Sequence, residues 1–506
     1  MTSMRAGLRL GAPLLLLGLG LLAQTVDLRI LQTADVHAAV DHSRRDPESG
    51  GWLRIATLIN RLRKEAGPER TLVIDCGDTC QGTLLGVSTQ GGIGPAMLNA
   101  VGYDFWIPGN HEFDFGLKRY VELCDAFTGI LLCGNVHISL TGTPRSWTSW
   151  RMVTKGGARV AIIGANASYL RHWYPEHATR FQVDLVADQL RLAMPAILRA
   201  RPDAIVLAIH QGWMEEDRRQ VNEIPALVRL FPELDLILGG HTHRPRPGRR
   251  LGMKTWYAQP PPHGEALVQV DLKIDVGRHR VLSVESQLVK PTADTPQDAR
   301  VAKAVAPMLD HARKTAGREV GTVTAEISAT GTPGIDCGTG ELLCRVFAEA
   351  AKCPVVIHGK LSDLSLGKGP VTEAHLFGLI PYENDIYTAR LTPAELELVV
   401  AEQWHNRKSY VFCGLYGVTA RVGEAGAKLG PVPAAFIGKD GRLLVAFNSY
   451  TAAGGGGRFP ELTRILEQPA SKKRNTRLAA RDALRTFLQH HPQLKITPKK
   501  WLQRGG

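Results

Sequence analysis

The 506-residue chain lacks a long apolar run outside its N-terminus, so no later segment could cross a bilayer. The N-terminus combines Arg5 and Arg9 with an apolar run that ends at Ala23 and is short for a membrane span of ~20 residues. We interpret residues 1–23 as a secretory signal, and an uncleaved anchor is the alternative because Leu21 is larger than the small residue usual near a cleavage site. We therefore expect a secreted or periplasmic protein with no stable membrane span after cleavage.

The chain also lacks a second close pair of cysteines. Cys76 and Cys80 are near each other, but no other pair among the eight cysteines completes a thiolate zinc site. The cysteine spacing matches no small disulfide framework, although an exported protein can form disulfides. Because Cys is among the most often buried residue types, we expect Cys76 and Cys80 to pack as small buried residues, and a bond between them is the alternative.

Aromatic residues are few, at 6% of the chain, and we see none interleaved with a basic groove as nucleic acid binding usually requires. The formal net charge of +13 falls by two, to +11, when Arg5 and Arg9 leave with the signal. We interpret the remaining cations as a solvated basic face that attracts small anionic substrates, and we expect no nucleic acid partner. Hydrophobic residues at 44% and charged residues at 22% are typical of a folded globular protein.

The length of the chain is enough for two domains. From residue 26 to about residue 289, strand-like runs alternate with helical stretches such as residues 51–67 and 187–202, which predicts an α/β sheet domain. Residues 266–288 alternate apolar and polar residues around Val276-Gly277, as a closing β-hairpin would. We assign residues 24–290 to this first domain.

A linker helix is predicted within residues 291–320, and an α+β second domain within residues 321–506. In the second domain we expect helices at residues 340–352 and 480–492 and several strands between them. Residues 454–457 are four glycines, which predict a tight loop that can approach a ligand closely; a flexible turn is the alternative. We find no internal repeat.

Five apolar, strand-like stretches of the first domain each run into a cluster of metal-seeking residues. The clusters are Asp35 with His37, Asp78 alone, Asn110 with His111 and Asp114, His210 alone, and His241 with His243. A single His after a strand is more often structural than a ligand. However, ligands of open α/β sheets bind beyond the carboxyl ends of the strands, so five strands of one sheet that end this way would converge on one site.

These residue types predict a pair of divalent metal ions. Carboxylate, imidazole and amide ligands without thiolate suit Mn, Zn, Fe or Mg, and the sequence leaves the identity open. Two ions ~3.5 to 4 Å apart stabilise the attacking and leaving oxygens of a phosphate ester and lower the pKa of bound water towards 7, so that hydroxide can attack phosphorus. Such a pair needs a shared ligand, and Asp78 is the candidate.

His111 and Asp114 are the candidate catalytic pair. His111 follows Asn110 directly and can therefore reach the same cavity, while Asp114 can hold its ring and favour the imidazolium. A general acid with an orienting carboxylate would protonate the leaving oxygen. The alternative is a hydrogen-bonding loop residue at position 111.

The motifs as a set resemble those of the calcineurin-like metallophosphoesterases. They are Asp35-Val36-His37, Gly77-Asp78, Gly109-Asn110-His111-Glu112-Phe113-Asp114, His210-Gln211-Gly212 and Gly240-His241-Thr242-His243. With a signal in front and a second domain behind, nearly the whole chain is similar to the secreted 5′-nucleotidase family, which includes periplasmic UDP-sugar hydrolases and 2′,3′-cyclic phosphodiesterases. The resemblance implies an N-terminal four-layer α/β/β/α sandwich and a C-terminal domain that binds the organic part of the substrate.

The resemblance also implies roles for individual residues. Asp35, His37, Asp78 and His243 would hold one metal ion, and Asp78, Asn110, His210 and His241 the other. His111 and Asp114 would form the catalytic dyad. Tyr410 and Tyr450 would occupy the places of two rings that sandwich the nucleobase, although tyrosines in strands are more often packing residues.

Two positions depart from the family pattern. An Asn-Gly-Gly-x-Ile-Arg segment of the family is here residues 357–362, where Lys360 supplies a point charge and not a planar arginine. The glycine loop has Gly456 where the family places an aspartate on the ribose. Recognition of phosphate and ribose by the second domain should therefore differ from the family pattern.

The sequence thus predicts a secreted dinuclear-metal phosphoesterase that hydrolyses nucleotides by attack of metal-bound hydroxide. The alternative is a relative with another ester substrate: a cyclic nucleotide, a non-nucleotide phosphate, or a sulfur substrate as in the thiosulfohydrolases. A non-catalytic binding protein of the same fold predicts the loss of ligands, yet all of them are present.

Overall fold

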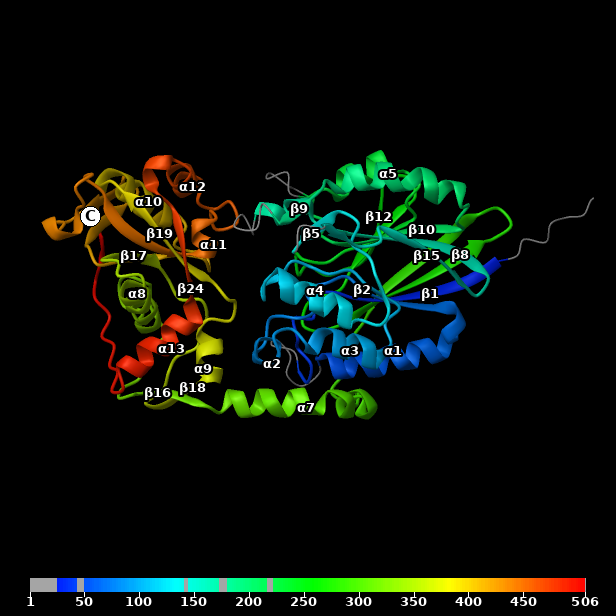
Figure 1. Ribbon diagram of the computed structural model, residues 1–506, viewed down its shortest axis with the longest axis horizontal. Helices are drawn as coiled ribbons and strands as arrows, with labels where there is room; N and C mark the ends of the chain where they lie inside the picture. Colours follow the sequence, from blue (N-terminus) through cyan, green and yellow to red (C-terminus); the bar gives the residue numbers. More distant parts are fainter. Residues whose placement is uncertain (1–24, 43–49, 141–143, 173–179, 216–221, 506) are drawn as a thin grey trace, which may run out of the picture.

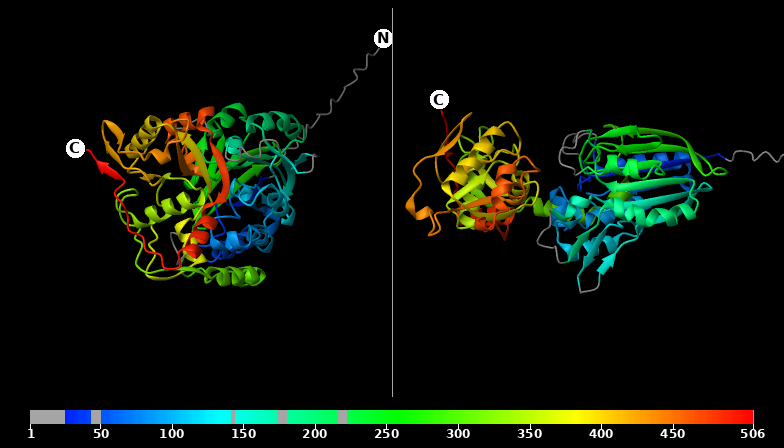
Figure 2. Two further views of the ribbon diagram at one scale, coloured as in Figure 1. Left: turned by 60° about the vertical axis from the view of Figure 1, so that its left-hand side comes forward. Right: turned by 90° about the horizontal axis from the view of Figure 1, so that it is seen from above.

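The computed structural model describes residues 25–42, 50–140, 144–172, 180–215 and 222–505. The predicted signal, residues 1–23, lies outside the described residues. The chain forms two domains joined by a long helix, α7 (Ala299–Ala316), along one side of the molecule (Figure 1). The right-hand view of Figure 2 shows the two domains side by side. Within the described part of the chain, no helix is long and apolar enough to cross a membrane.

Two six-stranded sheets form the framework of the first domain. The first sheet contains β1 (Thr25–Thr33), β2 (Thr71–Asp75), β3 (Phe105–Trp106), β4 (Ile130–Leu131), β14 (Leu267–Asp275) and β15 (Arg280–Val289), in the order β15-β14-β1-β2-β3-β4. The second contains β7 (Trp150–Lys155), β8 (Ala158–Asn166), β10 (Ala204–His210), β11 (Leu236–Leu238), β12 (Arg246–Leu251) and β13 (Thr255–Gln259), in the order β12-β13-β11-β10-β8-β7. A small third sheet is made of β5 (Val136–Ser139), β6 (Pro144–Ser146) and β9 (Phe181–Val183).

Helices cover the outer faces of the two large sheets. Between the sheets, Leu28 and Ile30 of β1 pack with Ile162 of β8 and Val206 of β10. The outer face of the first sheet packs on α1 (Trp52–Ala66), α3 (Ile93–Val101) and α7, and that of the second on α5 (Val186–Arg199) and α6 (Ile224–Leu230). The predicted four-layer α/β/β/α sandwich is confirmed. Parallel strands covered on both faces explain the nearly continuous apolar runs of the sequence.

The expectation that five strands of one sheet converge was wrong. The strands before the clusters are β1, β2 and β3 in the first sheet and β10 and β11 in the second. Within each sheet these neighbours run parallel. An apolar run shows that a strand is buried but not which strands it pairs with, so the sequence could not reveal the division. The clusters meet because the carboxyl ends of these five strands lie at the same end of the sandwich.

The second domain is built on the five-stranded sheet β20-β17-β23-β19-β24. Its strands are β17 (Val355–His358), β19 (Asp385–Leu391), β20 (Gly414–Tyr416), β23 (Leu443–Asn448) and β24 (Arg474–Ala479), with smaller pairings of β16 (Glu319–Val323), β18 (Gly369–Thr372), β21 (Ala420–Gly423), β22 (Gly426–Leu429) and β25 (Leu502–Arg504). The helices are α8 (Gly338–Ala350), α9 (Glu373–Leu379), α10 (Pro393–His405), α11 (Ser449–Ala452), α12 (Pro460–Leu466) and α13 (Ala480–His490). The predicted α+β class is confirmed, with helices near both predicted positions.

The linker helix α7 packs mainly on the first domain. The side chain of Asp298 caps its N-terminus by accepting a hydrogen bond from the amide of Val301 (2.9 Å). Val301 and Val305 are buried in the core that α1 and α3 share. Beyond its C-terminus, Arg318 pairs with Glu373 of α9 (2.6 Å). The linker helix therefore packs on the first domain, and the chain after it pairs with the second.

All eight cysteines are free and buried. Burial raises the pKa of the Cys76 and Cys80 thiols well above the usual value, with a further contribution from neighbouring carboxylates. The prediction that these two cysteines pack as small buried residues is confirmed.

Candidate metal centre

The predicted ligands gather at the carboxyl ends of the strands. The side chains form three groups, and within each group the ligand atoms all lie within 4.8 Å of one another. The groups are Asp35, His37 and His243; His37, Asp78 and His111; and Asp78, His210 and His241. Asp78 and His37 each belong to two of these groups. Each group is able to hold a metal ion, and the two shared residues make the groups one continuous cluster.

Direct distances show how close the side chains lie. His210 Nε2 is 3.2 Å from Asp78 Oδ2 and 3.2 Å from Asn110 Oδ1. On the other side, His243 Nε2 is 3.5 Å from Asp35 Oδ1. Asp35 and His210 are fully buried, Asp78 and Asn110 nearly so, and His243 is partly exposed. The cluster therefore has a buried floor and an open rim on the side of His243.

The backbone is strained at the cluster. Five of the predicted ligands adopt positive φ angles in the left-handed region, which non-glycine residues rarely populate: Asp35 (55°), His37 (53°), Asp78 (54°), His241 (74°) and His243 (55°). Hydrogen bonds hold these loops, because the amide of Asp35 donates to Gly77 O and that of His37 to Asp78 O, both at 2.8 Å. Backbone strain of this kind persists only where the surrounding structure holds it, and it is frequent at functional sites.

Hydrogen bonds fix the tautomers of two imidazoles. Nδ1 of His37 is 2.8 Å from the carbonyl of Gln81, and Nδ1 of His210 is 2.6 Å from that of Cys76. A carbonyl can only accept, so each ring donates from Nδ1 and turns Nε2 towards the cluster, where the neutral His37 ring offers a lone pair. Metal-binding histidines are oriented in the same way.

The buried groups set one another's charge. Burial raises the pKa of Asp35, whereas the cationic imidazoles, His210 first, overcome burial and hold the pKa of Asp78 well below its usual range. Burial alone would lower the pKa of His210, but Asp78 raises it to about 9. Burial lowers the pKa of His241 to about 3, so this ring is neutral. Imidazoles oriented towards the carboxyl groups of Asp35 and Asp78 are a donor set that fits divalent cations.

Glu112 organises the site but was not predicted. Its carboxylate is fully buried and accepts four amide hydrogen bonds, from Asp78 (3.0 Å), Thr79 (2.7 Å), Cys80 (2.9 Å) and Gly109 (2.5 Å). It thereby ties the loop of Asp78 to the loop of Asn110. The only sequence signal was its place in the quoted Gly109 to Asp114 motif, and no spacing argument distinguishes it from a surface glutamate.

The structure places the catalytic candidates at the rim. His111 Nδ1 is 2.8 Å from Asp114 Oδ2, and His111 Nε2 is 4.0 Å from Asp78 Oδ2. Burial would lower the pKa of His111, but the carboxylates of Asp114 and Asp78 outweigh it and raise the pKa to about 10. The ring is therefore an imidazolium at neutral pH, as a general acid requires.

Two further rings near the cluster were also missed. Tyr382, in the second domain, stacks on His111 with ring centroids 6.0 Å apart and an interplanar angle of 27°. His263 is buried, has a φ of 58°, and lies 5.4 Å from His37 between ring centroids. Neither residue carries a sequence signal, because each approaches the cluster only through the fold.

The predicted substrate residues all lie in the second domain. Tyr410 is 81% exposed and Tyr450 is 40% exposed. Arg458 connects them: its guanidinium carbon is 5.5 Å from the Tyr410 ring centroid, and Nη1 donates to Tyr450 Oη at 3.3 Å. Exposed rings next to an arginine could contact a ligand, and this arginine was not predicted.

Lys360 and Gly456 differ in how they could serve a substrate. Lys360 Nζ donates to Ala329 O (3.0 Å) and to Asp363 Oδ1 (2.7 Å). Its charge is therefore already paired. Gly456 lies in the predicted tight loop, with φ of 66°, and its three glycine neighbours also have positive φ. The tight loop is confirmed, and glycine is the residue that adopts this conformation without strain.

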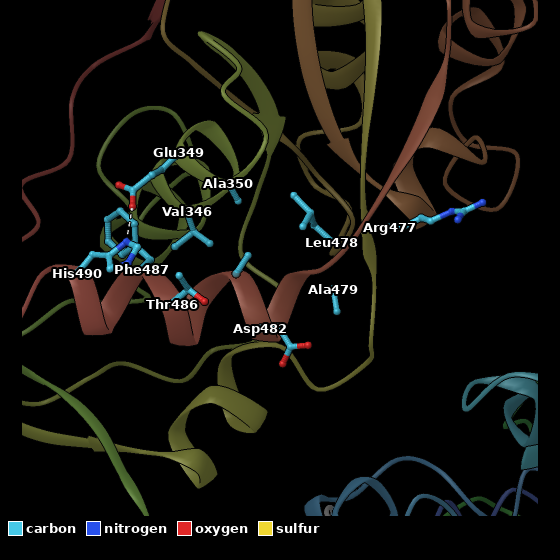
Figure 3. A pocket seen from close by; sticks show the side chains of 11 residues that line it. Val346, Glu349, Ala350, Arg477, Leu478, Ala479, Asp482, Thr486, Phe487 and His490 are labelled. Atoms are coloured by element: carbon cyan, nitrogen blue, oxygen red, sulfur yellow. Dashed lines mark hydrogen bonds and ion pairs between the residues drawn. The ribbon is translucent and has the colours of Figure 1, made fainter.

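A groove in the second domain does not contain the predicted site residues. It lies between α8 and the segment from β24 to α13, lined among others by Val346, Leu478 and Phe487 (Figure 3). Its two carboxylates are paired, because Glu349 lies 3.4 Å from His490 and 2.9 Å from His491, and Asp482 pairs with Arg485. We therefore locate the candidate site at the Asp/His cluster.

Comparisons with known proteins indicate the family of the chain. A family model of calcineurin-like phosphoesterases matches residues 28–245, and one of the 5′-nucleotidase C-terminal domain matches residues 319–464. Protein UshA of Yersinia enterocolitica is 22% identical over 523 residues, which cover 93% of this chain and 92% of that protein. A snake venom 5′-nucleotidase of Gloydius brevicauda is 29% identical over 253 residues, 47% of this chain and 40% of the venom protein, so the chain matches less than half of that relative's length.

Among solved structures, the 5′-nucleotidase precursor of Thermus thermophilus has a TM-score of 0.66 at 18% identity, covering 95% of this chain and 99% of that one. At this identity the likeness establishes the shared fold of both domains.

Proposed function

Because the chain belongs to the calcineurin-like phosphoesterases that carry a 5′-nucleotidase C-terminal domain, we propose that it is an exported enzyme that releases phosphate from nucleoside 5′-monophosphates or related phosphate esters. The family predicted from the motifs is confirmed, as is the enzyme class, a metal-dependent phosphoric ester hydrolase. The substrate, the number of metal ions and the location are the proposal. Export is supported by the arginines and apolar run of residues 1–23.

Two divalent cations are assigned to the cluster. Asp35, His37, Asp78 and His243 are proposed to hold one, and Asp78, Asn110, His210 and His241 the other. The observation that supports this proposal is the position of Asp78, which lies in one group with His37 and in another with His210 and His241. Bound there, the cations supply positive charge to the phosphate oxygens and lower the pKa of water.

The chain's own residues perform the remaining chemistry. His111, held by Asp114, is proposed to donate a proton from Nε2 to the oxygen of the departing alcohol. Its raised pKa keeps that proton available at neutral pH. Glu112 fixes the loops that present Asp78 and Asn110, so the ligands are in place before substrate arrives.

The second domain is proposed to bind the organic part of the substrate. Tyr410 and Tyr450, with Arg458 beside them, offer two rings and one guanidinium. We propose the domain division 24–290, 291–320 and 321–506, in which the last segment provides specificity. The glycine at 456 removes a carboxylate that would hold ribose, so affinity for nucleosides is expected to depend on stacking.

A second candidate substrate class follows from Lys360. Its pairing with Asp363 leaves no cation free at the segment where the family carries an arginine. That observation favours a relative acting on another ester, such as a cyclic nucleotide, a non-nucleotide phosphate or a thiosulfonate.

One assay panel tests the proposal. Purified protein loaded with Mn²⁺ is incubated with p-nitrophenyl phosphate, nucleoside mono-, di- and triphosphates, cyclic nucleotides, UDP-glucose and thiosulfonates, and bound metal is quantified in parallel. We expect metal-dependent phosphate release, highest for a nucleoside 5′-monophosphate and abolished by chelation. Full metal occupancy with no turnover of any ester would contradict the proposed function, and highest turnover of another ester would replace the proposed substrate.

A further inference from the structure

The general acid of the first domain is covered by a loop of the second. Tyr382, which stacks on His111 at 6.0 Å, lies between α9 and β19 in the second domain. The stacked ring limits the orientations that the imidazole can adopt. The orientation of the proton donor therefore depends on how firmly this loop is held.

The loop around Tyr382 is fixed by the N-terminus of α13. The carbonyl of Asn384 accepts a hydrogen bond from the amide of Ala480 at 2.8 Å. The side-chain amide of Asn384 donates to Tyr382 O at 3.0 Å, and its carbonyl oxygen accepts from Ser449 Oγ at 3.0 Å. Asn384 thus ties the segment after Tyr382 to α13, to α11 and to Tyr382 itself.

Arg481, the next residue of α13, holds the middle of the loop. Its amide donates to Glu383 Oε1 at 3.4 Å, and its Nε lies 3.3 Å from Glu383 Oε2. The guanidinium carbon is 5.0 Å from the ring centroid of Phe377 on α9. One side chain therefore contacts the residue next to Tyr382 and the helix that leads into the loop.

The burial of Arg481 requires an explanation beyond an ordinary ion pair. Arg481 is only 4% exposed, and in the described chain its Nε and Nη2 have no hydrogen-bond acceptor of good geometry. Burying a charge with unsatisfied donors is costly. Burial lowers the pKa of Arg481, whereas the negative charges of Glu383 and of Asp114, in the dyad, oppose this effect. Both carboxylates therefore favour the charged form of the guanidinium.

We propose that Arg481 is a positioning residue for the His111–Asp114 dyad: it holds the Tyr382 loop of the second domain against the general acid of the first. This inference rests on the proposed function, in which His111 is the proton donor. It predicts that even a small aryl phosphate, which needs little recognition by the second domain, is hydrolysed more slowly when Arg481 is changed.

The test is a double-mutant cycle with p-nitrophenyl phosphate and Mn²⁺-loaded protein. We expect Arg481→Gln to lower kcat roughly 10-fold with KM within about 2-fold, because a misplaced catalytic group slows the chemical step. In the His111→Ala background the same substitution should have no further effect on kcat. Arg481→Lys should recover part of the loss by restoring the charge. Equal loss in both backgrounds, or an unchanged rate, would overturn the proposal.

A matched control and a second variant secure the result. Arg485→Gln, one turn later on α13, removes an arginine that pairs with Glu373 (2.8 Å) and should lower the melting temperature without changing kcat. Glu383→Gln should lower kcat in the wild-type background and have no further effect in the His111→Ala background. This variant replaces Arg481→Gln in the cycle if Arg481→Gln fails to fold. An effect of Glu383→Gln that persists in His111→Ala would contradict the positioning role.

A measurement independent of turnover separates this inference from the proposed function. The ring protons of His111 in the NMR spectrum of selectively labelled protein should shift in Arg481→Gln, since the stacked Tyr382 ring shields them. Unchanged His111 signals would overturn the inference even if the wild-type enzyme is active. A wild-type protein without phosphatase activity but with the expected shift would refute the proposed function alone.

Discussion

His111 is the single residue whose loss should be easiest to interpret. We predict that His111→Ala slows release of phosphate from p-nitrophenyl phosphate by roughly 10² to 10⁴-fold, the usual contribution of a positioned acid, with bound metal unchanged. Steady-state kinetics and metal quantification on the same preparation test this. His137, which forms a similar pair with Asp184 (3.0 Å) away from the cluster, is the control, and His137→Ala should retain the rate. An unchanged rate in His111→Ala would remove the dyad from the mechanism.

Glu112 supports the ligands without contacting a substrate. In Glu112→Gln an NH2 group would replace one of the two carboxylate oxygens, each of which accepts two backbone amides, so donor would face donor. We expect a lower melting temperature and a metal affinity about 10- to 100-fold weaker, the usual effect of losing a group that orients ligands. Thermal unfolding and calorimetric Mn²⁺ titration are the measurements. Glu122→Gln, on the surface of α4 (Leu117–Ala126), should change neither quantity, and wild-type affinity in Glu112→Gln would refute this role.

His358 links stability to pH. The ring is fully buried against Phe347, with ring centroids 4.3 Å apart, and burial lowers its pKa to about 3. In the unfolded chain its pKa is about 6.5, so between these values the unfolded state binds more protons and stability falls as pH decreases. Above about pH 6.5 the ring is neutral in both states, and His358 does not lower the free energy of unfolding. Below that pH, protonation of the unfolded chain lowers the free energy of unfolding by at most about 1.4 kcal/mol per pH unit.

The measurement is urea unfolding of wild type and His358→Gln at several pH values. We expect a smaller loss of stability in the variant as pH falls from about 6.5 to about 4.5. His405→Gln, which removes an exposed histidine, should follow the wild type. Parallel pH dependence of His358→Gln and wild type would show that His358 is not the responsible group.

At the scale of elements, the loops after the strands hold the metal ligands in conformations that the strands alone would not produce. The five ligands with positive φ lie in loops that are held by the carboxylate of Glu112 and by backbone hydrogen bonds between loops. Gly109 is required here, because a Cβ at this position would lie 2.3 Å from Asp78 Oδ1. The strands therefore bring the loops to one end of the sandwich, and the hydrogen bonds between loops fix the conformation of the ligand residues.

The linker helix α7 gives a stability prediction. Val305 is 1% exposed in the core shared with α1 and α3. Val305→Ala removes two buried methyl groups and leaves a cavity, so we expect the free energy of unfolding of the first domain to fall by about 2 kcal/mol. Leu192→Ala, at a position 84% exposed on α5, is the control and should have little effect. The measurement is the midpoint of thermal unfolding of the first domain in each variant. Equal midpoints for Val305→Ala and the wild type would show that α7 does not stabilise that domain.

Elements and ligands were predictable to different degrees. Asp35, His111 and His243 could be found because their types and their places after apolar runs reflect local chemistry. The division of the five strands between two sheets could not, since strand pairing joins residues far apart in sequence. Glu112 and Tyr382 were missed for the same reason: one acts by joining two loops, and the other reaches His111 from a different domain.

At the scale of the whole molecule, the two domains have separate tasks that meet at one rim. The first domain holds the cluster, and the second brings Tyr382 to His111. The net positive charge of +13 over the whole chain favours the approach of anionic esters. Domain arrangement, and not sequence proximity, therefore completes the site.

Anomalous diffraction from crystals of the Mn²⁺-loaded protein tests the central claim most directly. The account predicts two manganese peaks ~3.5 to 4 Å apart, both bound by Asp78, with Asp35, His37 and His243 around one and Asn110, His210 and His241 around the other. A single peak, or two peaks that do not share Asp78, would contradict it.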